Sequence, residues 1–328
     1  MLKVKARTLW CAALLACSPA ASWAQQAAKD YPSRPIRLVV PYAPGGTMDF
    51  IGHVLGQKLA SALGQNLFLD NRAGAGGAIG TDAVAKAAPD GYTILVTSSA
   101  HAMLPSISKK LPYDAVKDLA PIALVARGVG SVLVVHPSVP ARSVREFIAL
   151  AKARPGMLNY GSGGVGSVTH FGPESFSLAA GIRMTHVPYK GVGQAIIDII
   201  AGRVEVGVVS ATVVLAHIRS GKLRALGITA PARWSELPNV PTIDEAGLKG
   251  YTYILWYGMW FPAGTPAEYG ARIRAETAKA FEDPATKRTF AEQGLVAVMV
   301  GPQEFAKLIA DDIEFNRQLV ARIGLTPQ

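Results

Sequence analysis

The chain has 328 residues, of which 50% are apolar and only 17% are charged. This composition excludes a disordered chain and a coiled coil, and two cysteines are too few for a disulfide-stapled small domain. The length predicts about two domains, each of which can bury a core of its own. The formal net charge of +10 raises the possibility of a nucleic-acid partner.

The first residues have the three parts of a secretory signal peptide. A basic start at 3–7 is followed by an apolar stretch at 8–16 and by a small-x-small sequence that ends at Ala24. We therefore expect residues 1–24 to be cleaved off after Ala24 and the mature protein to be periplasmic. Lipoprotein cleavage before Cys17 is a minor alternative, because the apolar run ahead of this cysteine is short.

Removing residues 1–24 takes away three of the 33 basic residues, none of the 23 acidic residues and both cysteines, so the mature chain has a charge of +7. A chain without cysteine excludes disulfides, thiol nucleophiles and thiolate metal sites. Because the remaining lysines and arginines are scattered and no groove-reading motif is present, we expect no nucleic-acid partner. No later stretch is apolar over the roughly 18 residues that a membrane-spanning helix needs.

Short β-branched runs alternate with helical periods along the chain, which is typical of βα units around a mainly parallel sheet. In the first part, this pattern predicts strands at 36–40, 67–69 and 92–97 and helices at 49–63 and 78–87. In the second part, it predicts strands at 131–136, 158–160, 184–187, 204–209 and 225–229, separated by helices. We therefore expect an α/β protein.

The last part of the chain returns to the βα pattern. A Pro-rich passage at 231–241 and a capping box at Thr242 and Glu245 are expected on the solvent side. The aromatic stretch 251–261 is expected to lead the chain back to the first lobe, before a helix that follows Pro266. The final elements are a predicted strand at 296–300 and a C-terminal helix from Pro302.

These elements predict two α/β lobes with a cleft between them. Lobe 1 is expected to comprise 25–128 and 254–328, and lobe 2 is expected to comprise 129–253. The chain then crosses between the lobes twice, and we expect the hinge near 125–131 and 251–260. No internal repeat or low-complexity segment interrupts this pattern.

A glycine-rich loop at 41–49 lies between the first predicted strand and the first predicted helix. Glycines let a ligand approach the backbone closely, and a helix start offers unpaired N–H groups to an anion. An ordinary βα turn capped by Thr47 or Asp49 explains the same residues equally well. The candidate ligand contacts in this loop are Tyr42, Ala43, Pro44, Gly45, Gly46, Thr47, Met48 and Asp49.

A second glycine-rich loop follows the predicted strand at 158–160. Gly161, Gly163 and Gly166 match the dinucleotide pattern G-x-G-x-x-G, but the end of the next strand, 187–190, lacks the acidic residue that should hold the ribose. We therefore interpret the segment as an anion-binding loop rich in Gly and Ser. Its candidate ligand contacts are Ser162, Gly163, Gly164, Val165, Gly166, Ser167 and Thr169.

Other segments are weaker candidates. The glycine loop at 71–78 is better explained by close packing of a helix on a sheet. Ser98 and His101 follow a predicted strand and could line the cleft, although a single histidine there more often has a structural role. Tyr189 and Ser210 complete the expected set of ligand contacts.

Signals for catalysis are weak. The chain has neither a G-x-S-x-G nor an H-E-x-x-H motif. Its six histidines are dispersed without the spacing of metal ligands. We therefore expect no catalytic residues, no metal site and no cofactor.

Several motifs occur in one register from about Tyr31 to the C-terminus. They are the 41–49 loop, NRAGAGG at 71–77, APDGY at 88–92, LPYD at 111–114, YGS at 160–162, VPYKG at 187–191 and LPNVPT at 237–242. In these motifs the chain resembles the Bug proteins, which are extracytoplasmic solute-binding receptors of tripartite tricarboxylate transporters.

The resemblance implies a two-lobe, type II-like periplasmic-binding-protein fold, often called a Venus flytrap. It also implies a monomer without cofactor or catalysis, which binds one small carboxylate and presents it to a cognate two-subunit permease in the inner membrane. In this family, backbone N–H groups, hydroxyls and ordered waters hold the carboxylate, from loops like 42–47 and 162–169.

The chain departs from the family pattern at His53, where Arg is common, at Met48, where a small residue is common, and at Leu104, where Asn is frequent. Each replaces a polar or small residue by an apolar or larger one, and Trp256, Tyr257 and Trp260 lie near the expected crossover between the lobes. We therefore expect a less polar pocket that prefers a monocarboxylate with an apolar or aromatic body.

Two alternatives stay open. A periplasmic hydrolase or lyase could use the same cleft, with Asp49 or His170 as acid or base. A ligand receptor for a membrane sensor kinase would share the binding chemistry and differ in its membrane partner.

Overall fold

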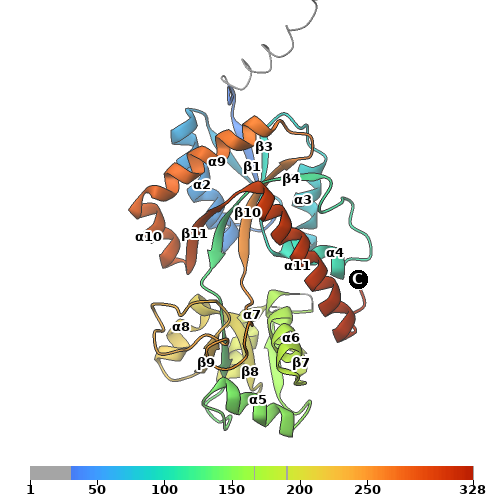
Figure 1. Ribbon diagram of the computed structural model, residues 1–328, viewed down its shortest axis with the longest axis vertical. Coiled ribbons are helices and arrows are strands. Elements are labelled where there is room, and N and C mark those ends of the chain that lie inside the picture. The colour runs from blue at the N-terminus through green and yellow to red at the C-terminus, as the bar shows by residue number, and fades with distance from the viewer. Residues whose placement is uncertain (1–30, 166, 190, 328) are drawn as a thin grey trace, which may run out of the picture.

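The computed structural model describes residues 31–165, 167–189 and 191–327, which form two lobes joined at a narrow waist (Figure 1). Each lobe has a β-sheet with helices on both faces, so the predicted two-lobe α/β fold is confirmed. The predicted signal peptide, with Cys17 and Ala24, lies outside the described residues. None of the helices within the described ranges combines the length and the apolar character of a membrane span.

The sheet of lobe 1 has six strands among the described residues. They are β1 (Ile36–Val40), β2 (Leu67–Asn71), β3 (Thr93–Ser98), β4 (Leu119–Gly128), β10 (Trp256–Pro262) and β11 (Leu295–Val300). Their order across the sheet is β11-β4-β10-β3-β1-β2. β1 pairs in parallel with β2 and β3, whereas β10 runs antiparallel to β3 and β4, and β11 antiparallel to β4.

Helices cover both faces of this sheet. One face carries α2 (Thr47–Leu63), α9 (Ala267–Glu282) and α10 (Pro284–Glu292), and the other carries η1 (Ala75–Gly77), α3 (Ala78–Ala85), α4 (Ala100–Ile107) and α11 (Pro302–Ile323). Alternate side chains of β1 point to opposite faces of the sheet and are buried on both. Leu38 and Val40 belong to the core under α2, and Val39 belongs to the core under α3. A strand buried on both faces has a continuous apolar sequence, as β1 does.

The sheet of lobe 2 has five strands within the described chain, in the order β7-β6-β8-β5-β9. They are β5 (Ser131–Val135), β6 (Asn159–Ser162), β7 (Thr185–Pro188), β8 (Val206–Ser210) and β9 (Arg224–Ile228). α5 (Val144–Ala153) and α6 (Val168–Ala180) pack on one face, and α7 (Val192–Ile200) and α8 (Ala211–Arg219) pack on the other. β6 is parallel to β7 and β8, and β5 is antiparallel to β8 and β9.

The expectation of mainly parallel sheets is wrong, because both sheets are mixed. The connectivity explains the difference. β5 carries the chain away from the waist into lobe 2, and β10 carries it back into lobe 1. Strands that begin at the waist are therefore antiparallel to the strands that end there.

The Pro-rich passage at 231–241 lies mainly on the solvent side, as expected, since residues 231–233, 235–236 and 238–239 are exposed. Its Trp234 and Leu237 side chains turn inward and are buried in the core of lobe 2, which was not predicted. The bonds of the capping box do form: Glu245 N–H donates to Thr242 Oγ1 at 3.0 Å, and Thr242 N–H donates to the Glu245 carboxylate at 2.9 Å. They close a turn and not a helix.

In the described chain, the crossings between the lobes lie after β4 and before β10, and they are tied to each other. Gly128 N–H donates to the Leu255 carbonyl at 2.8 Å. The buried hydroxyl of Thr229 accepts from Ser131 N–H at 2.8 Å and donates to the Tyr253 carbonyl at 2.6 Å. This side chain therefore holds both crossings in register.

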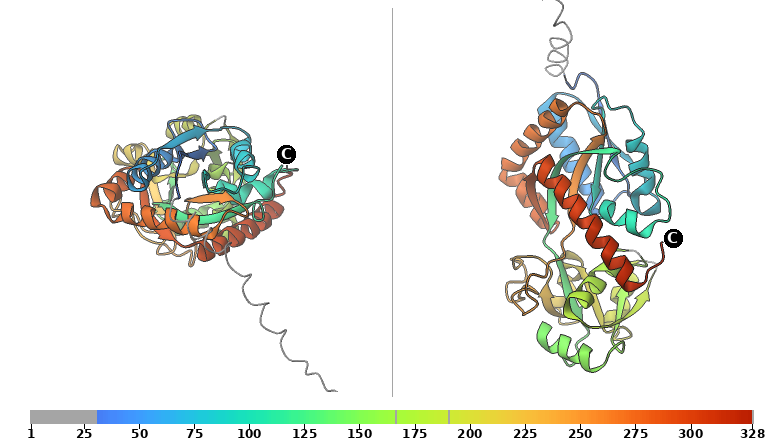
Figure 2. Two further views of the ribbon diagram at one scale, coloured as in Figure 1. Left: turned by 90° about the horizontal axis from the view of Figure 1, so that it is seen from above. Right: turned by 45° about the vertical axis from the view of Figure 1, so that its right-hand side comes forward.

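The C-terminal helix makes a further contact between the lobes. α11 begins on lobe 1, and its last turns reach the side of lobe 2, as the right-hand view of Figure 2 shows. There Leu319 and Val320 form one apolar cluster with Met103 of α4 and Phe171 of α6. The cluster thus joins residues of both lobes beside the waist.

Candidate functional site

The loops that follow four strands face the waist between the lobes. β1 and β3 end at the edge of their sheet where β4 leaves for lobe 2, because β10 runs antiparallel to both β3 and β4. β6 and β8 end at the edge where β5 enters lobe 2, because Ser131 pairs with Ser210. In open α/β sheets, ligands bind beyond the carboxyl ends of such strands.

The loop after β1 is organised by the buried side chain of Asp49. Its carboxylate accepts from Gly45 N–H at 3.0 Å and from the Asn71 amide at 2.9 Å, and Asn71 also donates to the Tyr42 carbonyl at 3.1 Å. The hydrogen bond from Gly45 and that from Asn71 hold the pKa of Asp49 below its usual value. Asp49 therefore shapes the loop as an anion whose oxygens already have donors.

The N-terminus of α2 is open at the tip of this loop. Gly46 is the N-cap residue, no side chain caps the helix, and the first intrahelical bond runs from Phe50 N–H to the Gly46 carbonyl at 3.0 Å. Residues 43–47 are exposed, and a Cβ on Gly46 would meet nothing within 4 Å. The free N–H groups and the partial positive charge of the helix start suit an anion.

The loop after β6 is held mainly by its own hydrogen bonds. The buried Ser162 hydroxyl lies 2.6 Å from His186 Nε2 and accepts from Gly164 N–H at 3.1 Å. Gly163 N–H donates to Thr169 Oγ1 at 2.8 Å, and Ser167 caps α6 by accepting from His170 N–H at 3.3 Å. The predicted contact Gly166 lies outside the described residues.

Three stacked rings support this loop from below. The His170 and His186 rings lie 4.0 Å apart, and the Tyr160 ring lies 4.9 Å from that of His186. Burial lowers the pKa of His170 to about 4 and also lowers that of His186. This stack was not predicted, because β6–β7 pairing brings Tyr160 beside His186, and His170 reaches them from α6.

Thr47 of lobe 1 and Ser210 of lobe 2 line one hollow of about 30 Å³ at the waist. Ser131, Thr212 and Tyr257 also line it, and none of these three was among the predicted ligand contacts. Hydroxyl groups thus meet there from both lobes, and the space is large enough for a water molecule. Ser131 and Thr212 lie at or beside the ends of strands, and this position is the feature of the sequence that could have identified them as site residues.

Two predicted ligand contacts belong to the core, so their prediction is wrong. Met48 is 6% exposed and packs under α2 with the core of lobe 1. His101 is 1% exposed, lies 2.8 Å through Nε2 from the Ala115 carbonyl, and has a pKa lowered by burial to about 4. Both follow from helix geometry, which turns these positions toward the sheet.

The other predicted contacts range from buried to exposed. The Asp49 and Ser162 side chains are buried and bonded to neighbouring residues of lobe 1 and lobe 2, respectively. Ser98, at the end of β3, lies 3.4 Å from the Tyr42 hydroxyl, and thus touches the loop after β1. The Tyr189 hydroxyl donates to Asp198 at 2.7 Å on lobe 2. Val165, at the tip of the loop after β6, is 49% exposed.

Two of the three departures from the family pattern, Met48 and Leu104, are buried in apolar clusters of lobe 1. The expectation that these two side chains make the pocket less polar is therefore wrong, because they belong to the core. His53 has an exposed side chain, 3.7 Å from Asp49.

Residues 51–325 match a family model described as "Tripartite tricarboxylate transporter family receptor". The chain belongs to this family. The receptor is 38% identical to the protein BugT of Bordetella pertussis over 299 residues, which cover 90% of this chain and 91% of BugT. It is 36% identical to a UPF0065 protein of Pseudomonas sp. strain P51 over 296 residues, 90% of this chain and 88% of that protein.

Solved structures agree with this family and with its fold. The receptor is similar to Rpa4515 of R. palustris with adipate at 30% identity and a TM-score of 0.76, over 91% of this chain and all of the other. It is similar to the periplasmic binding protein BugD at 29% identity and a TM-score of 0.72, over 91% of this chain and 100% of the BugD chain. MatC of Rhodopseudomonas palustris with bound malate has 29% identity and a TM-score of 0.72, over 88% of this chain and 100% of the MatC chain. The expected resemblance to Bug receptors is confirmed.

Proposed function

We propose that this receptor works in the periplasm as a monomer, captures a small carboxylate at the waist and presents it to a two-subunit permease of the inner membrane. The observation that carries this proposal is the open N-terminus of α2, whose Thr47 lines the same hollow as Ser210 of the opposite lobe. Relatives bound to adipate and malate support a carboxylate as the ligand.

In the proposed mechanism, the carboxylate first binds the N–H groups at 46–48 and then draws lobe 2 toward lobe 1. Because Asp49 already holds Gly45 N–H, the N–H groups of the first helical turn are the donors that the ligand uses. The hydroxyls of Ser210 and Thr212 then approach the same anion. We place the lobe boundaries at 128/129 and 253/254, where the chain crosses between the sheets.

We further propose that the ligand is a monocarboxylate with an apolar or aromatic body. Tyr257, Leu255, Val129 and Leu295 provide apolar surface in the hollow that holds Thr47 and Ser210. Such a surface matches an apolar body better than the second and third carboxylates of a tricarboxylate, since an unpaired charge loses hydration against it.

We propose binding without turnover. Asp49 is held by two donors, the His170 side chain is buried, and the hydroxyl of Ser162 is fully buried beside His186. A nucleophile or base needs access to the substrate, which these positions do not give. Of the two membrane partners, we favour the permease over a sensor kinase, because the matching family is that of a transporter.

The capture of a carboxylate is tested by native mass spectrometry of the mature protein, followed by calorimetry with the compound identified. We expect one retained carboxylate per chain and saturable binding. Incubation with excess compound should leave it chemically unchanged by NMR. Steady consumption of the compound would mean that the cleft is an active site.

The role of the α2 N-terminus is tested by Gly46→Val. Gly46 has φ −96° and open space at its Cβ position, so valine fits the fold but fills the space that the ligand approaches. We expect at least a tenfold loss of affinity, about 1.4 kcal/mol or more. Gly301→Val is the matched control, because Gly301 is also an uncapped N-cap with φ −67° and open space, at the start of α11. Equal affinities of the two variants would remove this loop from the site.

The ligand class is tested by a thermal-shift screen of the purified receptor. We expect an aromatic or branched monocarboxylate to raise Tm and a tricarboxylate to leave it unchanged, because only the bound form gains stability from the ligand. Stabilisation by tricarboxylates alone would overturn the preference for an apolar body while leaving carboxylate capture intact.

A further inference from the structure

A cavity of about 870 Å³ lies between the lobes, apart from both glycine-rich loops. Its upper wall comes from β4, α10 and β11 of lobe 1, and its lower wall comes from α8 and the segment 230–236 of lobe 2. Figure 1 shows α10 and β11 directly above α8 and β9 at this side of the waist. No residue of 42–49 or of the described part of 162–169 lines it.

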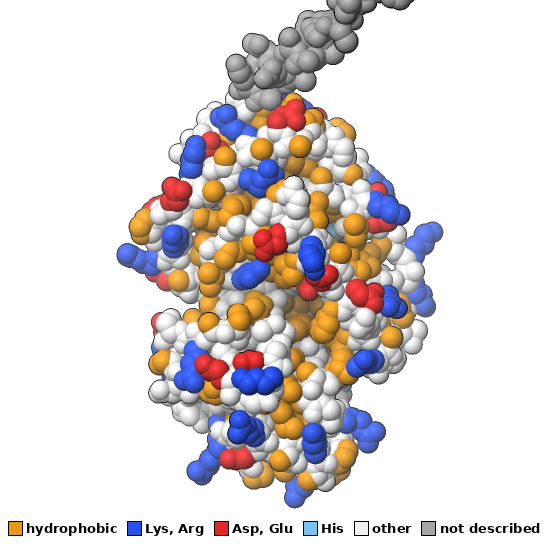
Figure 3. Space-filling view, in the orientation of Figure 1, with side chains coloured by type: hydrophobic (Ala, Val, Ile, Leu, Met, Phe, Trp, Pro, Cys, Tyr) orange, Lys and Arg blue, Asp and Glu red, His pale blue; other side chains and the backbone are white. Residues whose placement is uncertain are grey.

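The wall of this cavity is largely apolar. Leu215, Trp234, Leu295, Val296 and Val298 line it, and Val296 is 50% exposed although it is a large apolar side chain. Figure 3 shows apolar side chains gathered along the waist on this face of the molecule. Displacement of water from an apolar wall of this kind lowers the free energy, which favours the binding of a ligand with apolar surface.

The charges around the cavity leave guanidinium groups available. Arg233 pairs with Glu245 at 2.7 Å, and Glu236 pairs with Arg219 at 2.6 Å, so these charges are compensated. Arg127 and Arg288 also line the cavity, and neither forms an ion pair with a described residue. Glu292 is the remaining acidic residue in the wall, which leaves an excess of positive charge.

We propose that this cavity binds a second small molecule, an organic anion with an apolar or aromatic body, at a site distinct from that of the carboxylate captured at the α2 N-terminus. The volume lies within the range of about 300–1,000 Å³ that small-molecule sites have. The body packs against Trp234, Leu215 and the β11 residues, and the acidic group pairs with Arg127, which is half-buried on β4. Arginine binds carboxylates and sulfonates through two parallel N–H groups.

The second molecule acts on the hinge, because its site has one wall on each lobe. Gly128, Val129, Thr212 and Leu295 line both this cavity and the hollow that holds Thr47 and Ser210. An occupant that contacts both walls stabilises the lobe angle at which the cavity is open. Its binding therefore changes the affinity for the captured carboxylate, and the captured carboxylate changes its affinity by the same factor.

The probe for this site is 1-anilinonaphthalene-8-sulfonate, whose fluorescence rises in apolar surroundings. We expect saturable binding with one strong site per chain by calorimetry. Ala291→Trp, on the exposed side of α10, places an indole in the cavity and should weaken the probe at least about tenfold. Ala285→Trp is the matched control, because Ala285 is exposed on the same helix and does not line the cavity.

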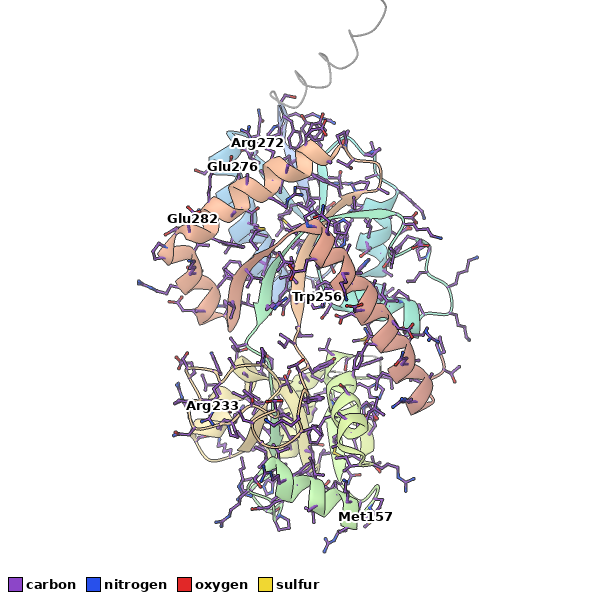
Figure 4. All side chains as sticks on the ribbon, viewed as in Figure 1. Met157, Arg233, Trp256, Arg272, Glu276 and Glu282 are labelled. Carbon is purple, nitrogen blue, oxygen red and sulfur yellow. The ribbon has the colours of Figure 1, made fainter. Side chains whose placement is uncertain are left out.

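The charge is tested separately with Arg127→Gln, which should weaken the probe about three- to tenfold by removing the paired guanidinium. Arg272→Gln is its control, since Arg272 lies on α9 away from the waist (Figure 4). The same view shows Arg233 on the lobe 2 side of the waist. Circular dichroism and Tm verify that each variant folds.

Gly46→Val separates this proposal from the proposed function. We expect it to leave the probe's affinity within about twofold of the unmodified receptor. Loss of probe binding in Gly46→Val, with normal binding in Ala291→Trp, would place the probe in the carboxylate cleft and overturn the second site. The absence of saturable binding would overturn it as well, and neither result would bear on carboxylate capture.

Discussion

His101 is held in its neutral form by its surroundings. Its Nε2 lies 2.8 Å from the Ala115 carbonyl, which can only accept, so this nitrogen carries the proton. Its Nδ1 is buried and has no hydrogen-bond partner among the described residues. Burial removes the ring from water and disfavours its charged form, which is the physical cause of the lowered pKa, and a second proton on Nδ1 would also have no acceptor.

This residue predicts a loss of stability in acid. Between pH 6.5 and about 4 the unfolded chain binds a proton at His101 and the folded chain does not. The free energy of unfolding therefore decreases as the pH is lowered, by about 3 kcal/mol over this range. His101→Gln, which keeps a donor for Ala115, should flatten the pH dependence in urea unfolding. His170 and His186 add to the slope in the same direction, so some dependence persists.

The control for this experiment is His53→Gln, because the His53 side chain is 68% exposed. We expect its unfolding free energy to follow that of the unmodified receptor at each pH. If His101→Gln and the unmodified receptor lost stability in parallel, His101 would not be the residue that titrates.

At the residue scale, the sequence revealed the site only where local chemistry marks it. Gly45, Gly46 and Thr47 were predicted because glycines beside a helix start are visible in the sequence. Tyr257 and Ser131 were missed, because they reach the waist through the pairing of strands distant in the chain. Met48 was assigned wrongly because a position inside the loop motif already belongs to the first turn of α2.

At the scale of the elements, α11 is the helix that connects the lobes outside the crossings. Leu319 is fully buried against Phe171 of lobe 2, whereas Ile309 of the same helix is buried in a cluster of lobe 1. Truncating either side chain leaves a cavity and should cost about 3 kcal/mol. The two variants should differ in which part of the molecule they loosen.

Leu319→Ala should accelerate amide hydrogen exchange in α6, because it weakens the contact between Phe171 and α11. Ile309→Ala should leave exchange in α6 unchanged while lowering the overall stability. Faster exchange of α6 in both variants, or in neither, would show that α11 does not restrain lobe 2.

Among the elements, the predicted strand at 36–40 coincides with β1, and the other predicted strands overlap observed ones, because buried apolar runs are visible in the sequence. β4 was not predicted as a strand. It contains Pro121, which argues against a central strand, yet the register with β10 shifts between Met259 and Trp260 and thereby accommodates the proline. α10 was also missed, although Asp283 caps it through Ala285 N–H at 2.9 Å.

At the scale of the whole molecule, Thr229 couples the two crossings. Thr229→Val keeps the shape of the side chain but leaves Ser131 N–H and the Tyr253 carbonyl without their partner. We expect a loss of about 2 kcal/mol in urea unfolding and a broader range of lobe angles. Thr277→Val is the control, because the buried Thr277 hydroxyl bonds only the Ile273 carbonyl one turn back in α9.

The lobe angle is measured by electron–electron resonance between two spin labels. Cys11 and Cys17 both precede residue 25, so in a chain that starts at residue 25 Met157→Cys on lobe 2 and Glu282→Cys at the end of α9 define one distance across the waist (Figure 4). Thr229→Val should widen the distribution of this distance, and Thr277→Val should not. An unchanged distribution would mean that other contacts fix the hinge.

The arrangement of the two lobes could be predicted, whereas the direction of their strands could not. A run of apolar residues indicates a strand, but its direction depends on which end of the sheet the chain enters. β5 and β10 enter from the opposite lobe, and nothing local in their sequences records this. The mixed sheets are therefore a property of the connectivity and not of the strands themselves.

The position of β10 has a consequence for how the protein matures. β10 lies between β3 and β4 in the sheet, although it follows β4 by more than a hundred residues along the chain. Until residue 262 has been synthesised, β3 and β4 have no strand to join them, and the first lobe cannot form its central pairing. Contacts of such long sequence separation form slowly. Folding of the first lobe is thus completed only after most of the chain, including all of lobe 2, has been made.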